Sequence, residues 1–331
     1  MPFDFDAAVQ APFRMQPGLR RLADGAVQLT PSVVPQRGYA RHLREKLAVL
    51  GAFADQALCR APGFDPSPAL AALSAHAAAG HPQAWVEDGD EGRAAALGWG
   101  LDGQGQPHDL GGDASPSDWP EIGPLLRCLP VDWRRAALLL LAFDEDFAII
   151  DAHTGTLPWL AVALPSSWAP ADKVGRSFAQ VHGPVADNRL IVGAAEHLMR
   201  LVTGNDRWER FVWTISPHPR LHAHPLRLDP AGWPALLSGD ALAANAWFRS
   251  ERQTFIPVPG ASQAVFTIRV DVQPLAKVVD SPVRALRLHD ALASMSDAVL
   301  AYRGLTPVCD GLLRWLSAMA QGQRSTPEPG L

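Results

Sequence analysis

Helix-like and strand-like patterns occupy separate parts of this chain of 331 residues, and their separation limits the folds that it can adopt. Apolar residues recur every three or four positions over 39–60, as Leu43 and Leu47 illustrate, which predicts a helix. Helical patterns return near the end, at 283–302 and 312–319. Most strand-like runs lie between these regions, so we predict an α+β fold rather than alternating βαβ units.

Shorter patterns give the remaining elements. A helix is predicted over 67–80, with Ser67 as its N-cap and Gly80 at its end. Two β-capable runs around a Thr-Gly turn, 147–151 and 156–164, predict a hairpin. We further expect strands at 138–141, 211–215, 252–256 and 264–272, the last two paired, helices at 190–202 and 241–248, and a loop at 87–118 with at most one short strand near 94–99.

The charge of the chain argues against a nucleic-acid partner. The formal net charge is −5 at pH 7, and the isoelectric point is near 6.1. Proteins that bind nucleic acids normally present a basic face that neutralises phosphates. We therefore expect no nucleic-acid partner.

The sequence predicts a cytoplasmic protein that does not enter a membrane. The N-terminus, MPFDFDAAVQ, is acidic and lacks the basic region and apolar run of a secretory signal. The longest apolar run, 136–143, has about eight residues, whereas a spanning helix needs about 20.

The most irregular and chemically rich stretch is LPSSWAPADKVGRSFAQVHGPVADNR, at 164–189. Pro165, Pro170 and Pro184 fix backbone dihedral angles and remove amide donors. Two glycines permit a close approach of the backbone, and between them His182 carries an imidazole that can bind a metal or move protons. This composition predicts a ligand-binding loop.

This stretch resembles the signature of the haem-dependent oxidative N-demethylase family, in its haem-binding alpha subunit, where a PSxW turn leads through a Lys-Gly pair to an IHxPV motif. Two later segments are similar to the same family. ERQTFIPVPGASQAVFTIRVDVQPL, at 251–275, resembles its ERQT segment ending in an FTIR strand, and AYRGL, at 301–305, resembles its YKGL. Three matches in one order are stronger evidence than any one of them.

The resemblance implies a PAS-like antiparallel sheet around the haem, with flanking helices. The matched segments lie far apart and imply a single large domain over 39–320, although the length would allow two domains. Residues 1–38 are expected to form an extended lead-in on the surface of this domain. Residues 321–331 have the composition of a disordered tail.

By the resemblance, His182 is the axial iron ligand, because it corresponds to the histidine of the IHxPV motif. A neutral imidazole is the usual proximal ligand of a non-covalent haem b. Its other ring nitrogen should donate to a carbonyl or carboxylate. A loop histidine that caps the local backbone is the alternative.

Covalent attachment of the haem is excluded by the cysteines. Cys59, Cys128 and Cys309 are isolated, and no CxxC or CxxCH motif is present. The same absence excludes an iron–sulfur site and a zinc ribbon in this chain.

Four basic residues inside the matched motifs are candidates to pair with the haem propionates: Lys173, Arg176, Arg252 and Arg269. A guanidinium can bind a carboxylate through two hydrogen bonds. Each of the four could instead be an ordinary surface charge.

Glu251 and Glu196 are candidate catalytic residues, because a protonated amine beside the iron needs an acceptor. Glu251 lies in the ERQT match, whereas the predicted apolar stripe of 190–202 turns Glu196 toward solvent. The family tends to have an R-x-N-W strand, and here Val212 replaces the Asn. If that Asn serves the substrate pocket, the substrate differs.

Three histidines in SPHPRLHAHP, namely His218, His222 and His224, could be interpreted as metal ligands. No carboxylate or cysteine follows at a fixed motif spacing, and the prolines favour a surface loop over a zinc site.

The resemblance implies a haem-dependent, O2-using enzyme that removes a methyl group from a small secondary alkylamine, yielding a primary amine and formaldehyde. It also implies a flavin and iron–sulfur reductase as partner, and it allows a folate-binding subunit as a second one. The chain has no GxGxxG, P-loop or GxSxG motif in context, so reducing power must come from elsewhere. Two alternatives remain open: a haem-binding PAS-like sensor, and a binding protein that kept the scaffold without the cofactor.

Overall fold

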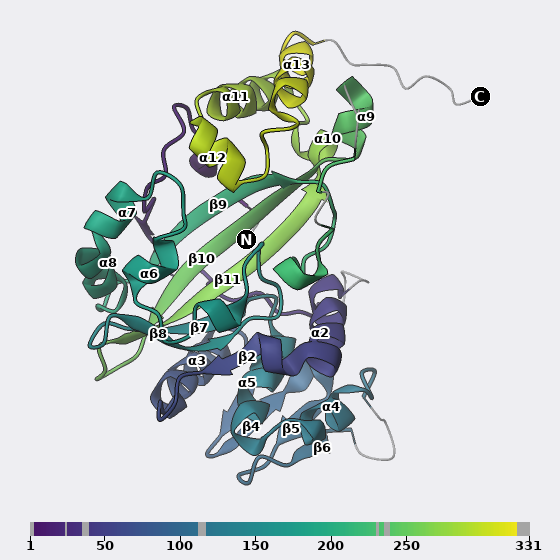
Figure 1. Cartoon of the computed structure of the whole chain (residues 1–331). Coiled ribbons are helices and arrows are strands. Elements are labelled where there is room, and N and C mark those ends of the chain that lie inside the picture. Colours follow the sequence, from purple (N-terminus) through teal and green to yellow (C-terminus); the bar gives the residue numbers. More distant parts are fainter. Residues whose placement is uncertain are drawn as a thin grey trace.

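The computed structural model describes residues 3–23, 25–34, 40–111, 117–229, 232–234 and 239–322. A long twisted sheet crosses the middle of the molecule, helices gather at both of its ends, and a smaller sheet lies at one end (Figure 1). Every pairing between the named strands is antiparallel. The predicted α+β class is confirmed.

The larger sheet has seven strands in the described ranges: β1 (Arg20–Arg21), β2 (Leu58–Arg60), β7 (Asp146–Asp151), β8 (Thr156–Ala161), β9 (Trp208–Ser216), β10 (Trp247–Pro257) and β11 (Gln263–Pro274). Their order across the sheet is β1-β9-β10-β11-β7-β8-β2. The smaller sheet consists, in order, of β3 (Val86–Asp88), β4 (Glu91–Ala94), β5 (Trp99–Leu101) and β6 (Pro107–Asp109).

The α-helices of the described ranges are α1 (Phe5–Ala8), α2 (Arg41–Ala57), α3 (Ser67–Gly80), α4 (Ile122–Cys128), α5 (Val131–Ala142), α6 (Phe178–His182), α7 (Arg189–Gly193), α8 (Ala195–Val202), α9 (Gly239–Ala244), α10 (Leu275–Val278), α11 (Pro282–Ala293), α12 (Asp297–Tyr302) and α13 (Cys309–Ala320). Single 3-10 turns lie at Ala95–Leu97, Pro170–Asp172 and Pro225–Arg227. None of the helices in the described ranges is both long and apolar enough to cross a membrane.

A hairpin of β10 and β11 forms the centre of the larger sheet. The two strands pair along almost their whole length. Their turn contains Gly260 at a φ of +73°, a left-handed conformation that glycine adopts at little cost. The predicted pairing of 252–256 with 264–272 is confirmed, and so is the predicted hairpin of 147–151 with 156–164.

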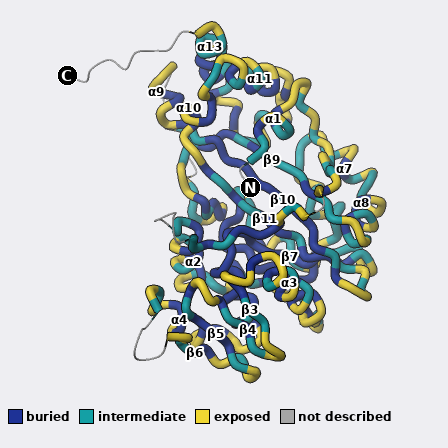
Figure 2. Tube along the Cα trace, turned by 180° about the vertical axis from the view of Figure 1, so that it is seen from behind, coloured by how far each residue is buried: buried dark blue, intermediate teal, exposed yellow. Residues whose placement is uncertain are grey.

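The two faces of the larger sheet have different coverings, because successive residues of a strand point to opposite faces. On one face, Trp213 and Phe248 pack with the group of α1 and α9 to α13. On the other, Ala148 and Phe255 pack with residues of α6 and α8. The central strands are therefore mostly buried, as Figure 2 shows.

The predicted strand at 138–141 is wrong, because these residues belong to α5. All four of its leucines are fully buried. A helix that is buried on all sides gives a continuous apolar run, which periodicity alone cannot distinguish from a buried strand.

The predicted loop at 87–118 is also wrong, since this region contributes most of the four-stranded sheet. Each strand has only three or four residues. Gly98 and Gly105 lie between the strands at positive φ. Turn-forming residues of this kind dominate the sequence pattern and hide the short strands. The strand expected near 94–99 is in fact a 3-10 turn between β4 and β5.

Two predicted long helices are each divided in two. The helix at 283–302 breaks between α11 and α12, where the Ser296 side chain accepts from the Val299 amide as an N-cap. The helix at 190–202 breaks into α7 and α8, and its buried residues differ from the predicted stripe. Leu190 is 60% exposed, whereas Met199 is buried.

Three boundaries differ from the prediction. Pro66, rather than Ser67, is the N-cap of α3, and the Ser67 amide and hydroxyl donate to Asp65. The helix expected at 241–248 ends at Ala244, because β10 begins three residues later. The helix expected at 39–60 is present as α2, but it ends at Ala57, and the next three residues form β2.

The N-terminal segment is not a surface lead-in. It contributes the short elements α1 and β1, and it buries Phe5, Val9, Leu22 and Leu29. Gln28 reaches the centre of the larger sheet, where its amide nitrogen donates to the Thr254 hydroxyl at 3.1 Å. The predicted disordered tail lies mainly outside the described residues, which end at 322.

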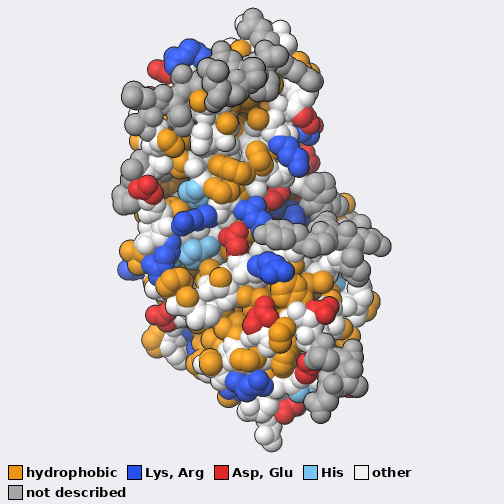
Figure 3. Space-filling view, turned by 90° about the vertical axis from the view of Figure 1, so that its right-hand side faces the viewer, with side chains coloured by type: hydrophobic (Ala, Val, Ile, Leu, Met, Phe, Trp, Pro, Cys, Tyr) orange, Lys and Arg blue, Asp and Glu red, His pale blue; other side chains and the backbone are white. Residues whose placement is uncertain are grey.

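Acidic, basic and hydrophobic side chains are interspersed on the face shown in Figure 3.

Candidate functional site

The loop that follows β8 is fixed by hydrogen bonds to a second loop. The Ser167 amide donates to the Ala223 carbonyl at 2.9 Å, and the Ala223 amide donates to the Pro165 carbonyl at 3.0 Å. Ser167 has a φ of 62°, a strained value for a residue with a side chain. The turn predicted to bind a ligand is therefore held in one conformation.

Arg249 on β10 joins these two loops. It is 3% exposed and donates to the Ser166 hydroxyl, to the Pro165 carbonyl, and to the carbonyls of Arg220 and Leu221. Sequence reasoning missed this residue, because its partners lie 28 or more positions away in the chain.

His182 ends the short helix α6, which begins with a capping box. The Ser177 hydroxyl accepts from the Gln180 amide, and the Gln180 side chain accepts from the Ser177 amide. One turn later, Nδ1 of His182 lies 2.9 Å from the Phe178 carbonyl. That carbonyl can only accept, so Nδ1 carries the proton and Nε2 presents a lone pair.

The electrostatics of His182 favour a neutral ring. Burial, together with the charges of Arg210 and Lys173, lowers its pKa to about 4. Among the described residues nothing hydrogen bonds to its Nε2. A neutral imidazole with Nδ1–H bound to a carbonyl and Nε2 free is the usual state of a metal-ligating histidine.

Below α6, one face of the larger sheet carries polar side chains. Arg210 on β9 is paired in register with Gln253 on β10, and Glu251 lies two residues away on the same face. The Gln253 amide donates to the Glu251 carboxylate at 2.6 Å. Glu251 is buried, and its negative charge raises the pKa of Arg210, because the two groups lie near each other.

Of the predicted propionate partners, Lys173 lies near His182. It is half-buried, burial lowers its pKa, and its Nζ donates to the Val181 carbonyl at 3.0 Å. Arg176 is exposed.

Arg252 and Arg269 point to the opposite face of the sheet from Glu251. Arg252 is buried and ion-paired with Glu209 at 3.0 Å, and Arg269 is ion-paired with Asp144 at 3.2 Å. The structure therefore does not bring these two arginines to His182.

Of the two predicted carboxylates, Glu251 is buried on the face of the sheet that α6 covers. Glu196 is exposed on α8. Of the three loop histidines, His222 places Nδ1 2.7 Å from the Ala163 carbonyl and stacks on His224. Within the described residues, no three side chains of the metal-binding types lie together.

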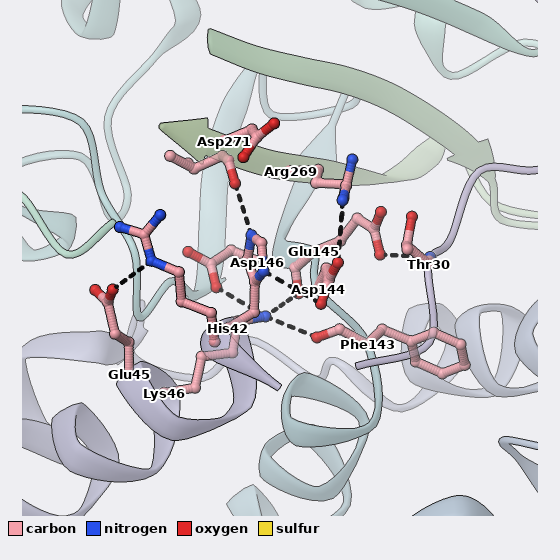
Figure 4. Close-up of polar contacts among 12 residues, drawn as sticks. Thr30, His42, Glu45, Lys46, Phe143, Asp144, Glu145, Asp146, Arg269 and Asp271 are labelled. Carbon is pink, nitrogen blue, oxygen red and sulfur yellow. Dashed lines mark hydrogen bonds and ion pairs between the residues drawn. The ribbon is translucent and has the colours of Figure 1, made fainter. Parts of the chain in front are cut away.

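A second polar cluster, shown in Figure 4, lies where α5 meets β7. The fully buried Lys46 donates to three carbonyls near the end of α5, those of Leu140, Phe143 and Glu145, and its ammonium lies 3.3 Å from Asp146. Lys46 thus caps the helix, and its charge is balanced by a carboxylate. The run Phe-Asp-Glu-Asp-Phe at 143–147 could have signalled this cluster.

Fold and site together define an antiparallel α+β protein in which a neutral histidine faces a polar patch of the central sheet. The profile of one family, described as haem-dependent oxidative N-demethylase, alpha subunit-like, matches residues 131–313, more than half of the chain. The chain belongs to this family. The matched range contains His182, Arg210 and Glu251.

The residues present fit the haem that the family name implies. His182 offers a lone pair on Nε2, as described above. Three side chains of β9 on the same face, Trp208, Arg210 and Thr214, each bury a polar atom that has no hydrogen-bond partner among the described residues. Buried polar groups in native proteins are nearly always paired, so these three indicate that a ligand or water completes this face.

Proposed function

We propose that this chain binds haem b non-covalently through His182 and serves as the haem subunit of an enzyme that demethylates a small secondary alkylamine. The observation that carries the proposal is the state of His182. Its Nδ1–H is bound to the Phe178 carbonyl while Nε2 is free and the ring is neutral. A haem-binding sensor could hold haem in the same way, so the reaction rests on the family.

In the proposed reaction, O2, two electrons and two protons convert the N-methyl group to a carbinolamine and release one water. The carbinolamine then collapses to the primary amine and formaldehyde. A bound haem would supply the oxidising chemistry. The chain would hold it through His182.

Glu251 is proposed to accept a hydrogen bond from the substrate ammonium. An ammonium group in a buried site is costly unless it is paired. Glu251 is the predicted carboxylate that lies on this face, whereas Glu196 is exposed and is not part of the proposal. Val212, opposite Glu251 in the register, makes the patch less polar and favours an amine with more carbon than dimethylamine.

Electrons are proposed to come from a flavin and iron–sulfur reductase, since this chain has no dinucleotide motif and no cysteine cluster. The words alpha subunit in the family description imply other subunits, of which a folate-binding one would take up formaldehyde. We further propose that 39–320 form one domain on a PAS-like sheet.

The test is to titrate His182→Ala and wild type with haem. Loss of the axial ligand should shift the Soret band and weaken haem binding. The control is His197→Ala, at an exposed position on α8, which should leave the Soret band and the haem affinity unchanged. An unchanged spectrum in His182→Ala would overturn the ligand assignment. Haem binding without formaldehyde from several N-methyl amines, given reductant and O2, would favour the sensor.

A further inference from the structure

The arginines on the two sides of the central sheet differ in their partners. On one side, Arg252 and Arg269 each have a carboxylate within 3.2 Å. On the other side, Arg210 and Arg249 have no ion pair within 4.0 Å among the described residues. Arg303, which lies beside β9 and over the ring of Trp213, has none among these residues either. The side of the sheet that faces α6 therefore has an excess of buried positive charge.

Glu251 is the carboxylate whose negative charge raises the pKa of all three guanidinium groups. One carboxylate cannot balance three cations. The two other carboxylates whose negative charge raises the pKa of Arg249 each form an ion pair with another cation. Asp146 pairs with Lys46, and Glu45 pairs with Arg41.

Two of the three arginines donate hydrogen bonds to neutral groups. Arg249 makes four hydrogen bonds to loop carbonyls and a hydroxyl. Arg303 donates to the Trp213 carbonyl and lies over the ring of Phe13, although its buried Nε has no hydrogen-bond partner among the described residues. Burial lowers the pKa of both guanidinium groups to about 10, which indicates that their charge is poorly compensated.

Arg210 differs from Arg249 and Arg303, because none of its N–H groups donates to a described residue. Its Nε is fully buried without a partner, and the described residues supply no hydrogen bond to any of its N–H groups. Trp208 and Thr214, on the same face of the same strand, each leave a buried polar atom unpaired. A guanidinium fork with free donors, in a field of excess positive charge, is suited to a carboxylate.

We propose that Arg210 binds a carboxylate of a ligand that lies against β9, with Arg249 and Arg303 supplying the positive potential that attracts it. The choice of ligand rests on the proposed function. The carboxylate belongs either to a haem propionate or to an acidic substrate such as an N-methyl amino acid.

The experiment measures haem and haem dimethyl ester binding to wild type, Arg210→Met and Arg210→Lys, with the exposed Arg200→Met as the matched control. If Arg210 binds a propionate, Arg210→Met loses about 10- to 100-fold in haem affinity, as expected for a charge-assisted hydrogen bond. Its affinity for the ester, which lacks carboxylates, stays unchanged. Arg210→Lys recovers part of the loss, and the Soret band keeps its position because His182 is intact.

The second arm titrates each haem-loaded protein with N-methylglycine and dimethylamine while following the haem spectrum. If the carboxylate belongs to the substrate, Arg210→Met binds haem normally and loses its response to N-methylglycine alone. Equal affinities of wild type and Arg210→Met for haem, its ester and both amines would overturn the proposal.

A separate measurement distinguishes failure of this proposal from failure of the proposed haem function. If wild type binds no haem, the thermal midpoint of the haem-free protein is measured with succinate. Stabilisation of wild type but not of Arg210→Met supports the carboxylate site, and equal midpoints overturn it. Arg210→Lys provides the folded comparison if the Met variant does not fold.

Discussion

Glu145 is a buried carboxyl group that titrates near neutral pH. Its Oε2 accepts from the Thr30 amide at 2.8 Å, and its Oε1 is buried without a hydrogen-bond partner among the described residues (Figure 4). Burial and the charge of Asp144 raise its pKa from 4.5 to about 7, although Arg269 and Lys46 oppose this. The folded protein therefore holds a proton that the unfolded chain has released.

The replacement Glu145→Gln is expected to remove this pH dependence. Between pH 4.5 and 7 the folded wild type binds the extra proton, so its stability falls as the pH rises through this window. The glutamine keeps an oxygen for the Thr30 amide and carries no charge. The variant should gain about 1–3 kcal/mol relative to wild type between pH 5 and pH 8, as measured by urea unfolding.

Glu196→Gln, at an exposed position on α8, is the control for this measurement. Its unfolding free energy should follow that of wild type at every pH. If the Glu145→Gln curve also runs parallel to wild type, Glu145 is not the titrating group.

At the scale of elements, α4 lies unusually close to the smaller sheet. Gly123 faces the indole of Trp99 on β5, and a Cβ at Gly123 would lie 2.1 Å from a ring carbon. Trp99 is buried and its Nε1 donates to the Trp119 carbonyl, so the ring cannot move aside. Gly123→Ala should destabilise the protein by about 1–3 kcal/mol, measured by thermal unfolding.

Gly51→Ala in α2 is the matched glycine substitution, because a Cβ added at Gly51 would have no neighbouring atom within 4 Å. It should be neutral or stabilising by about 0.5–1 kcal/mol, since alanine is the better helix former. Equal effects of the two substitutions would show that α4 can move away from β5.

At the scale of the whole molecule, the N-terminal segment is part of the core. Leu29 is 1% exposed and packs in the same cluster as residues of α2, α5 and β11. Leu29→Ala should cost about 2–5 kcal/mol, because a buried side chain is replaced by a cavity. Val27→Ala, two residues earlier and 41% exposed, should change the stability by about 0.5 kcal/mol or less.

Urea unfolding monitored by tryptophan fluorescence measures both variants. If Leu29→Ala behaves like Val27→Ala, Leu29 does not contribute to the core, and the segment lies on the surface of the domain, as the sequence predicted.

The sequence determined the features that depend on neighbouring residues. The periodicity of 39–60 and the alternation of 264–272 identify α2 and β11, because each pattern comes from residues that follow one another. The motif around His182 located the candidate ligand and, with two later segments, the family. The short strands in 87–118 could not be predicted, because three residues are too few for a period to be recognised.

Only the tertiary structure decided which side of the sheet each charge occupies and what pairs with it. Glu251 and Arg252 are adjacent in the chain yet face opposite sides, and the register of β9 beside β10 gives Arg252 its partner Glu209. Arg210, from the same strand as Glu209, is left with free donors on the His182 side. Strand register is set by packing between distant segments, and a pattern within one segment does not contain it.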